Sequence, residues 1–540
     1  MNKKATYVKP SGLAASAKYV LVGEQPGRVE VLEREPFVGP SGRILDSCLA
    51  SVGINRAECY VTNVIKDLDA PLEQYVVFKK SGVELSPEAQ EYVALLREEL
   101  EKTTARVIVA VGKVALYALT SRTAITKWRG SVLESTLLPG RLVIPCLHPA
   151  TVLPPKRVYK NKRLIQFDLQ KARLLVERGW KPKKRTYRTK PTFGEVVEYI
   201  ANVASSGQPF AFDVEVINEE LSCFSLAKSD TDGICCTFVA DGVDVYTPEQ
   251  ETEIMRLLTP LVEGDLVTVG QNLTFDGSFC LGRYGIFLNP KKIEDTMIAQ
   301  KILMPTYPKG LDFIASIHTT LPYYKEDGKK WIRVEGGSQE QFWVYNINDS
   351  FVCLEALPSL RRLLREQGNE ETYEETKKVV GPLMYMMQSG VRVDVGQMCS
   401  LRDLFSQKVA ELQQQLNELA GEELNVDSPK QMVTYFYTKK GYPPYKNKKT
   451  KGFSVDDDAL TRLAIKGSEE AKIIRKMRSL GKLISTYLDV EKVDPDGRIR
   501  CSYDPCGTKF SRLSSSENIF GTGMNLQNWP HLLQLLMWVD

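Results

Sequence analysis

Four acidic residues fall in three separate local patterns that could together bind metal ions. Asp213 and Glu215 lie in FAFDVEV, Asp276 lies in NLTFDGS, and Asp349 lies in YNINDS. Strand periodicity places the side chains of Asp213 and Glu215 on one face, opposite the apolar residues that alternate with them. Carboxylates gathered on one face can hold two divalent cations, the arrangement that cuts phosphodiester bonds. The sequence therefore predicts a metal-dependent nuclease site.

Two further residues are spaced to share a helix face with these carboxylates. Asn272 lies four residues before Asp276, and Tyr345 lies four residues before Asp349. On a helix, residues four apart are neighbours one turn apart. With 67 acidic residues in the chain, each of these patterns also arises by chance, so a purely structural role is the alternative for each. Their order within one α/β segment favours a shared site.

Composition limits the class of protein. The chain has 540 residues, 43% hydrophobic and 26% charged, which is typical of a globular protein of several domains. No apolar run approaches the length of a membrane helix, and the N-terminus lacks the apolar stretch of a secretory signal. The eleven cysteines are scattered without a CxxC pair, which favours reduced thiols in a cytoplasmic compartment.

The pattern of elements predicts an α/β multidomain protein that becomes helical towards its end. Apolar runs at 19–23, 106–112 and 141–147 suit buried parallel strands, and Ser86-Pro87 suits a helix start. Apolar residues at steps of three or four over 398–419 predict one buried helix face. We expect an α/β/α domain over 1–176, a basic linker over 177–191, a second α/β domain over 192–368 and a mainly helical part over 369–540.

Basic residues are concentrated between 156 and 190. Fourteen Lys and Arg residues stand there against two acidic residues, Asp168 and Glu177. A solvated linker accounts for such a run, and so does a strip that contacts nucleic-acid phosphates. Both interpretations stay open.

The carboxylate region resembles a known family. Residues 210–360, including DTMIAQKILMP and KGLDFIA, resemble the proofreading 3′–5′ exonuclease domain of family A DNA polymerases. The resemblance implies a ribonuclease H-like fold that acts on single-stranded 3′ ends of DNA. It implies two Mg²⁺ or Mn²⁺ ions on Asp213, Glu215, Asp276 and Asp349, a water-orienting role for Tyr345, and DNA contact by Asn272. Hard divalent cations do prefer such oxygen ligands.

The helical part resembles the thumb and the start of the palm of the same polymerases. GVRVDVGQM, LNVDSPKQM, TKGFSVDDDAL, LGKLISTYLD and FSRLSSSENIFGTGMNLQNWP appear in the family's order. The resemblance implies contact with primer–template DNA by Arg512, Asn525, Gln527 and Asn528. Amide and guanidinium groups can bind the acceptors that the minor groove presents at every base pair. Lys446, Lys448, Lys449 and Lys451 are either a phosphate-binding thumb tip or a solvated loop, and we favour contact.

The sequence stops at Asp540, before the palm carboxylates and the fingers helix of the family. We therefore expect no nucleotide incorporation by this chain alone. One alternative is a DNA-binding subunit of a split replicase whose palm and fingers lie on a second polypeptide. Another is a free-standing repair exonuclease.

The N-terminal region resembles the uracil-DNA glycosylase superfamily, nearest the iron–sulfur bacterial type. The resemblance rests on GEQPGRVEVLEREPFVGPSGRILD at 23–46, YVTNVIK at 60–66 and HPATVL at 148–153. It implies four site residues: Glu24 near the reacting sugar, Phe37 stacked on an extruded base, Asn63 at the base edge, and His148 at the uracil oxygen. For His148 alone, a structural histidine is the alternative, and for Glu24 a surface residue.

The cysteines that bind the cluster in that type are missing. None precedes Cys48, and Asp67 stands where a cysteine would follow the lysine. We therefore expect no iron–sulfur cluster, and a domain that binds DNA without cutting it stays possible. Fusion of such a domain to a family A polymerase resembles a large bacteriophage replicase, which would act in the host cytoplasm.

Overall fold

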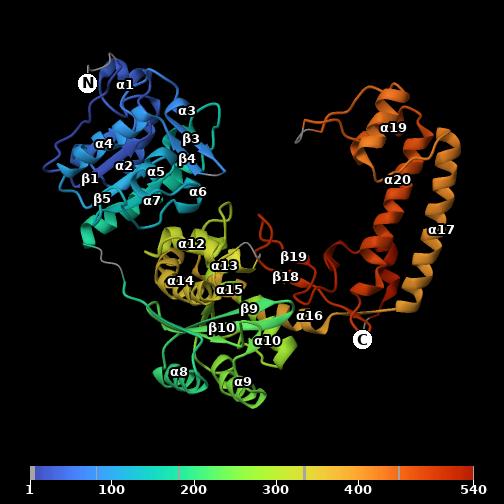
Figure 1. Cartoon of the computed structure of the whole chain (residues 1–540). Coiled ribbons are helices and arrows are strands. Elements are labelled where there is room, and N and C mark those ends of the chain that lie inside the picture. Colours follow the sequence, from blue (N-terminus) through green and yellow to red (C-terminus); the bar gives the residue numbers. More distant parts are fainter. Residues whose placement is uncertain (1–5, 81, 180–182, 333–335, 448–450, 539–540) are drawn as a thin grey trace. The chain divides into compact units, whose positions relative to one another are not determined.

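The computed structural model describes residues 6–80, 82–179, 183–332, 336–447 and 451–538. The chain, drawn in Figure 1, divides into two compact units. The first comprises residues 1–273 and 289–377, and the second comprises 274–288 and 378–540. Within the described residues, no helix has both the length and the apolar character needed to cross a bilayer.

A five-stranded sheet forms the centre of the N-terminal part, in the order β2-β1-β5-β7-β6. Its four parallel strands are β1 (Tyr19–Gly23), β2 (Cys59–Asn63), β5 (Val107–Val111) and β7 (Leu142–Cys146), and β6 (Leu133–Glu134) runs antiparallel at one edge. The apolar runs at 19–23, 106–112 and 141–147 are therefore strands, as predicted. Nearly all their residues are buried because helices cover both faces of the sheet.

Alternate residues of each strand enter two separate apolar layers. Val20 and Val22 of β1 pack with α4 (Pro87–Glu101) and α5 (Lys113–Thr120). Tyr19 and Leu21 pack with α2 (Pro40–Ser51) and α7 (Asn161–Arg178) on the opposite face. Ser86 caps α4 by accepting from the Ala89 backbone at 3.1 Å. This part is a three-layer α/β/α arrangement, as expected.

A six-stranded mixed sheet forms the centre of the remainder of the first unit, in the order β15-β14-β9-β10-β11-β8. The strands are β8 (Thr186–Thr189), β9 (Phe210–Ile217), β10 (Glu220–Ser229), β11 (Asp232–Thr237), β14 (Thr268–Gly270) and β15 (Ile293–Asp295). β9, β10 and β11 are antiparallel, and β14 runs parallel to β9. The long helix α14 (Gln339–Glu366) packs across β9, β10 and β11. Strand β8 lies inside the range 177–191 that the sequence predicts as a linker.

Buried charges join the two α/β parts of the first unit. Arg129 pairs with the carboxylate of Asp168 on α7 and donates to Ser316 Oγ at 2.8 Å, on α12 (Leu311–His318). Lys171 Nζ donates to three backbone carbonyls, including those of Ser316 at 2.6 Å and Thr319 at 2.7 Å. Burial, together with the nearby Arg129 charge, lowers the pKa of Lys171 to about 7. Lys171 of α7 therefore binds the backbone at the end of α12 directly, and Asp168 of α7 is linked to the same helix through Arg129.

Helices dominate the second unit. α20 (Glu469–Lys482) packs against both α17 (Val395–Ala420) and α19 (Asp457–Ile465), and α16 (Val380–Ser389) packs against α10 (Leu273–Tyr284). The predicted apolar face of 398–419 is confirmed in part. Leu412 and Leu416 are buried against the core that includes α20, whereas Leu404 and Leu419 are exposed. An apolar repeat alone does not predict which turns of a long helix are buried against another element.

Candidate functional site

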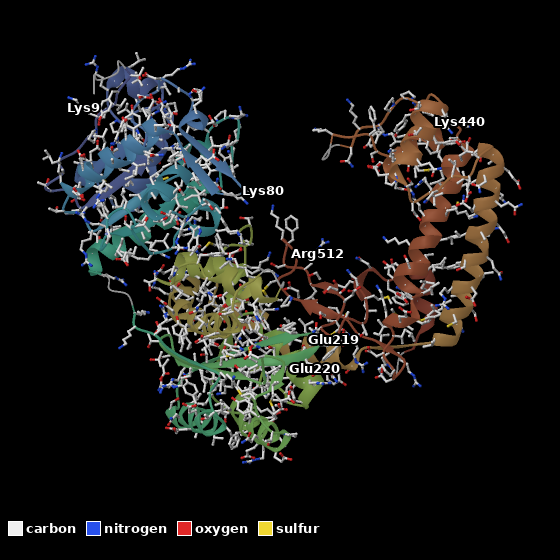
Figure 2. All side chains as sticks on the ribbon, viewed as in Figure 1. Lys9, Lys80, Glu219, Glu220, Lys440 and Arg512 are labelled. Carbon is white, nitrogen blue, oxygen red and sulfur yellow. The ribbon has the colours of Figure 1, made fainter. Side chains whose placement is uncertain are left out.

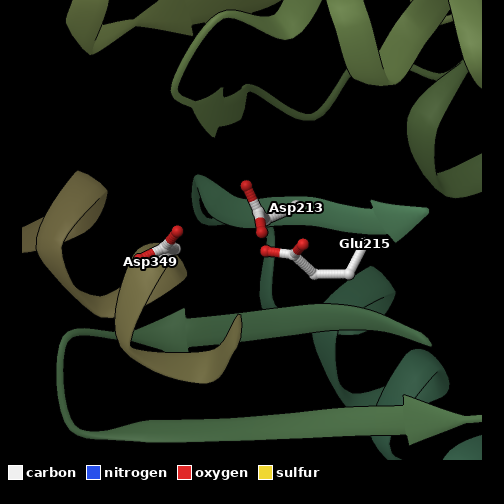
Figure 3. Close-up of side chains that lie close together, drawn as sticks. All are labelled: Asp213, Glu215 and Asp349. Atoms are coloured by element: carbon white, nitrogen blue, oxygen red, sulfur yellow. The ribbon is translucent and has the colours of Figure 1, made fainter. Parts of the chain in front are cut away.

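Strand β9 presents two carboxylates on one face. Asp213 and Glu215 alternate with Phe212 and Val214, whose side chains are buried. Asp213, Glu215 and Asp349 each offer a carboxylate oxygen, and these three oxygens lie within 4.8 Å of one another. Figure 3 shows the three groups directed towards a common point, two from β9 and one from α14. The structure therefore brings together three of the four predicted carboxylates.

Helix α14 carries Asp349 and Tyr345 one turn apart, as the spacing predicts. Tyr324 Oη donates to Asp349 Oδ1 at 2.5 Å. Lys325 Nζ donates to Asp349 Oδ2 and lies 3.2 Å from Tyr345 Oη. Burial disfavours the Lys325 ammonium, but Asp349 together with the β9 carboxylates raises the pKa of this lysine above its ordinary value. The lysine is therefore charged at neutral pH.

Tyr345 is only 9% exposed. Burial raises the pKa of its hydroxyl far above the ordinary value, and the charges of Asp349, Glu215 and Asp213 add to the effect. The hydroxyl keeps its proton at every physiological pH and can act as a hydrogen-bond donor. The site thus combines hard oxygen ligands with a neutral donor, which is a chemical set that fits Mg²⁺ or Mn²⁺.

Asn346 supports the carboxylates from inside the protein. It is fully buried, and its Nδ2 donates to Asp213 Oδ2 at 2.7 Å. The thiols of Cys223 and Cys235 lie 3.8 and 3.5 Å from its Oδ1. Sequence reasoning missed Asn346, although its position three residues before Asp349 on the same helix was a usable signal. It also missed Tyr324 and Lys325, for which no local pattern gave a signal.

The predicted helical pair of Asn272 and Asp276 is wrong in one respect. α10 begins at Leu273, and Asn272 precedes it with a left-handed backbone of φ 63°. The two side chains therefore do not share a helix face. The left-handed backbone of Asn272 turns the chain between β14 and α10. The backbone N–H of Leu273 then donates to Asp295 Oδ2 at 2.8 Å. Asp276 lies in the first turn of α10, 2% exposed, within the segment assigned to the second unit.

A cavity of about 380 Å³ lies beyond the carboxyl ends of β1, β2 and β7. This edge is where parallel α/β sheets bind ligands. Three of the predicted base-binding and catalytic residues, Phe37, Asn63 and His148, are among its lining residues. Gly23 makes room for two of them, because a Cβ there would lie 2.2 Å from Asn63 Oδ1 and 2.5 Å from the Phe37 ring.

His148 presents a defined ring orientation at this cavity. Its Nδ1 accepts a hydrogen bond from the Ala150 backbone at 3.2 Å, so the proton of the neutral ring is on Nε2. Burial lowers the pKa of His148, although the charges of Glu24 and Glu30 oppose the shift. The Phe37 ring lies 5.9 Å from the imidazole, centroid to centroid. The cavity therefore has an aromatic wall beside a polar donor.

Two acidic residues of the first motif, Glu24 and Glu30, have different surroundings. Glu24, the predicted catalytic acid, is not among the residues that line the cavity, and its Oε1 accepts from the Val114 backbone at 3.1 Å. Glu30 lines the cavity, is buried, and accepts from the Gly39 backbone at 3.1 Å. Sequence reasoning missed Glu30 because a glutamate in a charged helix is usually at the surface.

Asp67, which the sequence resemblance places at the position of a cluster-binding cysteine, has hydrogen-bond partners of its own in the structure. It is fully buried, and the hydroxyls of Tyr75 and Tyr92 both donate to its carboxylate, the first at 2.6 Å. The neighbouring Lys66 is buried as well and pairs with Glu99 at 2.6 Å. Asp67 and Lys66 thus connect the segment after β2 to α4, which carries Tyr92 and Glu99.

The residues predicted to contact duplex DNA lie in the second unit. Arg512, labelled in Figure 2, is exposed, as are Gln527 and Asn528. Asn525 is half-buried, and its side chain accepts from Ser515 Oγ at 2.6 Å and from the Asn528 backbone. Three of the four can reach a ligand, and Asn525 shapes the turn that presents them. Lys448 and Lys449 lie outside the described residues.

Two family models match separate parts of the chain. Residues 10–171 match the uracil DNA glycosylase superfamily, and residues 396–534 match DNA polymerase family A. The cavity described above lies within the first match, and Arg512, Asn525, Gln527 and Asn528 lie within the second.

Curated relatives are bacterial proteins named DNA polymerase I. That of Rhizobium leguminosarum is 31% identical over 285 residues, 51% of this chain and 27% of the relative. That of Pseudomonas aeruginosa is 30% identical over 305 residues, 52% of this chain and 32% of the relative. The chain thus matches about a third or less of their length. A solved structure, the POL domain of Pol1 from M. smegmatis in complex with DNA primer-template and dNTP, aligns at 20% identity and a TM-score of 0.49, covering 66% of this chain and 59% of that one.

Proposed function

We propose that this chain, which carries a uracil-DNA glycosylase-like domain and a family A DNA polymerase domain, is a 3′–5′ exonuclease acting on DNA ends in replication or repair. The observation that supports this most directly is the convergence of Asp213, Glu215 and Asp349 within 4.8 Å. Asp276 is proposed as the fourth ligand, by resemblance. The proposed cofactor is a pair of Mg²⁺ or Mn²⁺ ions.

The chain's own residues have distinct roles in this proposal. Asp213, Glu215 and Asp349, with Asp276, would hold the cations, which when bound would stabilise negative charge on the attacking and leaving oxygens. The Tyr345 hydroxyl, which stays protonated, would orient the attacking water by a hydrogen bond. Asn346 holds Asp213 in place through the 2.7 Å bond to its Oδ2. Asn272 would contact the DNA strand next to the site.

The test uses a single-stranded oligonucleotide labelled at its 5′ end. Wild-type protein with Mg²⁺ or Mn²⁺ should shorten it stepwise from the 3′ end, and chelation should stop the reaction. Asp213→Ala combined with Glu215→Ala should abolish shortening. Glu219→Ala with Glu220→Ala is the matched control, since both glutamates are exposed at the turn between β9 and β10 (Figure 2). Equal shortening by the two double variants would refute the proposal.

A second function is proposed for the N-terminal cavity, because Phe37, Asn63 and His148 line it together. We propose that it binds a base extruded from DNA, with Phe37 stacking on the ring and Asn63 hydrogen-bonding its edge. Glu24 is proposed to act near the sugar. Because Glu24 is not among the residues that line the cavity, cleavage of the glycosidic bond is tested separately from base binding.

Fluorescence anisotropy with a uracil-containing oligonucleotide tests this binding. Asn63→Ala should weaken binding of that oligonucleotide but not of its thymine counterpart. Alkaline treatment of the wild-type reaction then shows whether abasic sites form. Equal binding of the two oligonucleotides by wild-type protein would contradict base recognition.

A further inference from the structure

Lys325 lies against the carboxylate cluster, although the proposed exonuclease reaction as described above gives it no role. It is the first residue of α13 (Lys325–Ile332). Its side chain is 11% exposed, and its ammonium is bonded to Asp349 Oδ2. The ammonium also lies 4.5 Å from the centre of the Tyr345 ring. One cation is thus fixed between a proposed metal ligand and the tyrosine proposed to orient water.

Three carboxylates close together repel one another, and burial strengthens the repulsion. Asp349 is 7% exposed on its side chain, so water screens it weakly. A cation in contact with the cluster offsets this repulsion, whether it is an ammonium or a metal ion. Two cations at the same carboxylate repel each other, because each carries positive charge into the same poorly screened volume.

We propose that Lys325 acts as an internal counter-cation of the carboxylate cluster and competes with divalent metal ions for Asp349. Metal binding displaces its ammonium from Asp349 Oδ2 and leaves it beside Tyr345. There it can bind a phosphate oxygen of the 3′-terminal nucleotide. This inference rests on the proposed exonuclease function and adds a residue that couples metal binding to substrate binding.

The structure offers a rationale for the coupling. Tyr324 Oη donates to Asp349 Oδ1 at 2.5 Å, whereas the ammonium contacts the other oxygen, Oδ2, so departure of the ammonium does not remove the acceptor of the tyrosine. Asp349 therefore stays oriented during the exchange. The Lys325 ammonium lies over the rings of both tyrosines, 5.4 Å from the centre of the Tyr324 ring and 4.5 Å from that of Tyr345. A flexible side chain at a helix start can then move its charge without moving the helix.

Mn²⁺ binding to the full-length chain without DNA tests the proposal, with free Mn²⁺ measured by electron paramagnetic resonance. Lys325→Met should bind Mn²⁺ about tenfold more tightly than wild type, the effect of removing one competing charge interaction. Lys325→Arg should restore the wild-type affinity because it keeps the charge. Lys330→Met is the matched control on the same helix, since Lys330 is exposed, and it should leave affinity unchanged.

The DNA step has its own measurement. Lys325→Met should raise the KM for single-stranded DNA more than it lowers kcat at saturating Mn²⁺, and Lys325→Arg should correct most of that change. Equal or weaker Mn²⁺ binding by Lys325→Met would overturn the inference while leaving the exonuclease proposal intact. Wild-type protein that binds no more Mn²⁺ than Asp213→Ala with Glu215→Ala would overturn both. If Lys325→Met binds Mn²⁺ more tightly as expected but the wild-type protein does not shorten DNA, only the exonuclease proposal would be overturned.

Discussion

Replacing Asn346 by leucine should weaken metal binding at the proposed exonuclease site while leaving the protein folded. Leucine has a similar size but cannot donate to Asp213 Oδ2, the partner of Asn346 at 2.7 Å. Asp213 would then lose the group that fixes its orientation, while β9 and α14 keep their packing. The buried thiols of Cys223 and Cys235 lose a weak acceptor, which is a small additional cost.

Two estimates of the magnitude agree. A hydrogen bond to a charged group contributes about 1.5–3 kcal/mol. Loss of an outer partner of a metal ligand typically lowers metal affinity about 10- to 100-fold, equivalent to about 1.4–2.8 kcal/mol. We therefore expect the Mn²⁺ concentration for half-maximal exonuclease activity to rise about 10- to 100-fold. Activity at saturating Mn²⁺ should recover most of the wild-type rate.

Asn348→Leu is the control for this prediction. Asn348 lies two residues further along α14, is 6% exposed, and accepts from Tyr187 Oη at 2.9 Å. Its loss should lower the free energy of unfolding without changing the Mn²⁺ requirement. The assay is an Mn²⁺ titration of oligonucleotide shortening, with urea unfolding in parallel. Equal shifts in Mn²⁺ requirement for both variants would show that Asn346 acts only through stability.

Two further predictions concern the first unit. Because the unfolded chain protonates Lys171 below its ordinary pKa of 10.5 but the folded chain does so only below about 7, the free energy of unfolding should rise with pH across that window. In Lys171→Met, the free energy of unfolding measured with urea should rise less steeply with pH than in the wild type. The same dependence on pH in both proteins would contradict the lowered pKa of Lys171. Asp67→Ala removes the carboxylate to which the Tyr75 and Tyr92 hydroxyls donate, so the free energy of unfolding should fall by about 3 kcal/mol. A loss below about 1 kcal/mol in urea unfolding would show that water replaces the carboxylate.

The sequence predicts most of the sheet framework because apolar runs determine it. The strands at 19–23 and 107–111 are apolar throughout, and a fully buried parallel strand requires that composition. The alternation in β9 also predicts its buried and polar faces. Strand β8, by contrast, is Thr186–Thr189 in a basic run, and an edge strand of polar residues has no such signal.

The site is predictable only where its residues follow a local period. Tyr345 and Asp349 share a helix face, and their spacing shows it. Asn272 has the same spacing from Asp276 but lies outside the helix, because its left-handed backbone depends on the turn it closes. Lys325 reaches Asp349 from a different helix, and only the tertiary packing of α13 on α14 brings them together. Glu30 was missed for a related reason, since burial of a charged residue depends on distant neighbours such as Gly39.

The buried ion pair of Arg129 and Asp168 has a consequence for exchanging parts between related proteins. A chimaera joined near residue 180 would combine an N-terminal α/β part from one protein with the following part of another. Arg129 and Lys171 would then require Ser316 and Thr319, or equivalent acceptors, from the new partner. Without them, a desolvated ammonium and guanidinium would be left short of acceptors, at a cost of several kcal/mol. A chimaera of these two parts should therefore be stable only when it contains both the charged residues and their acceptors.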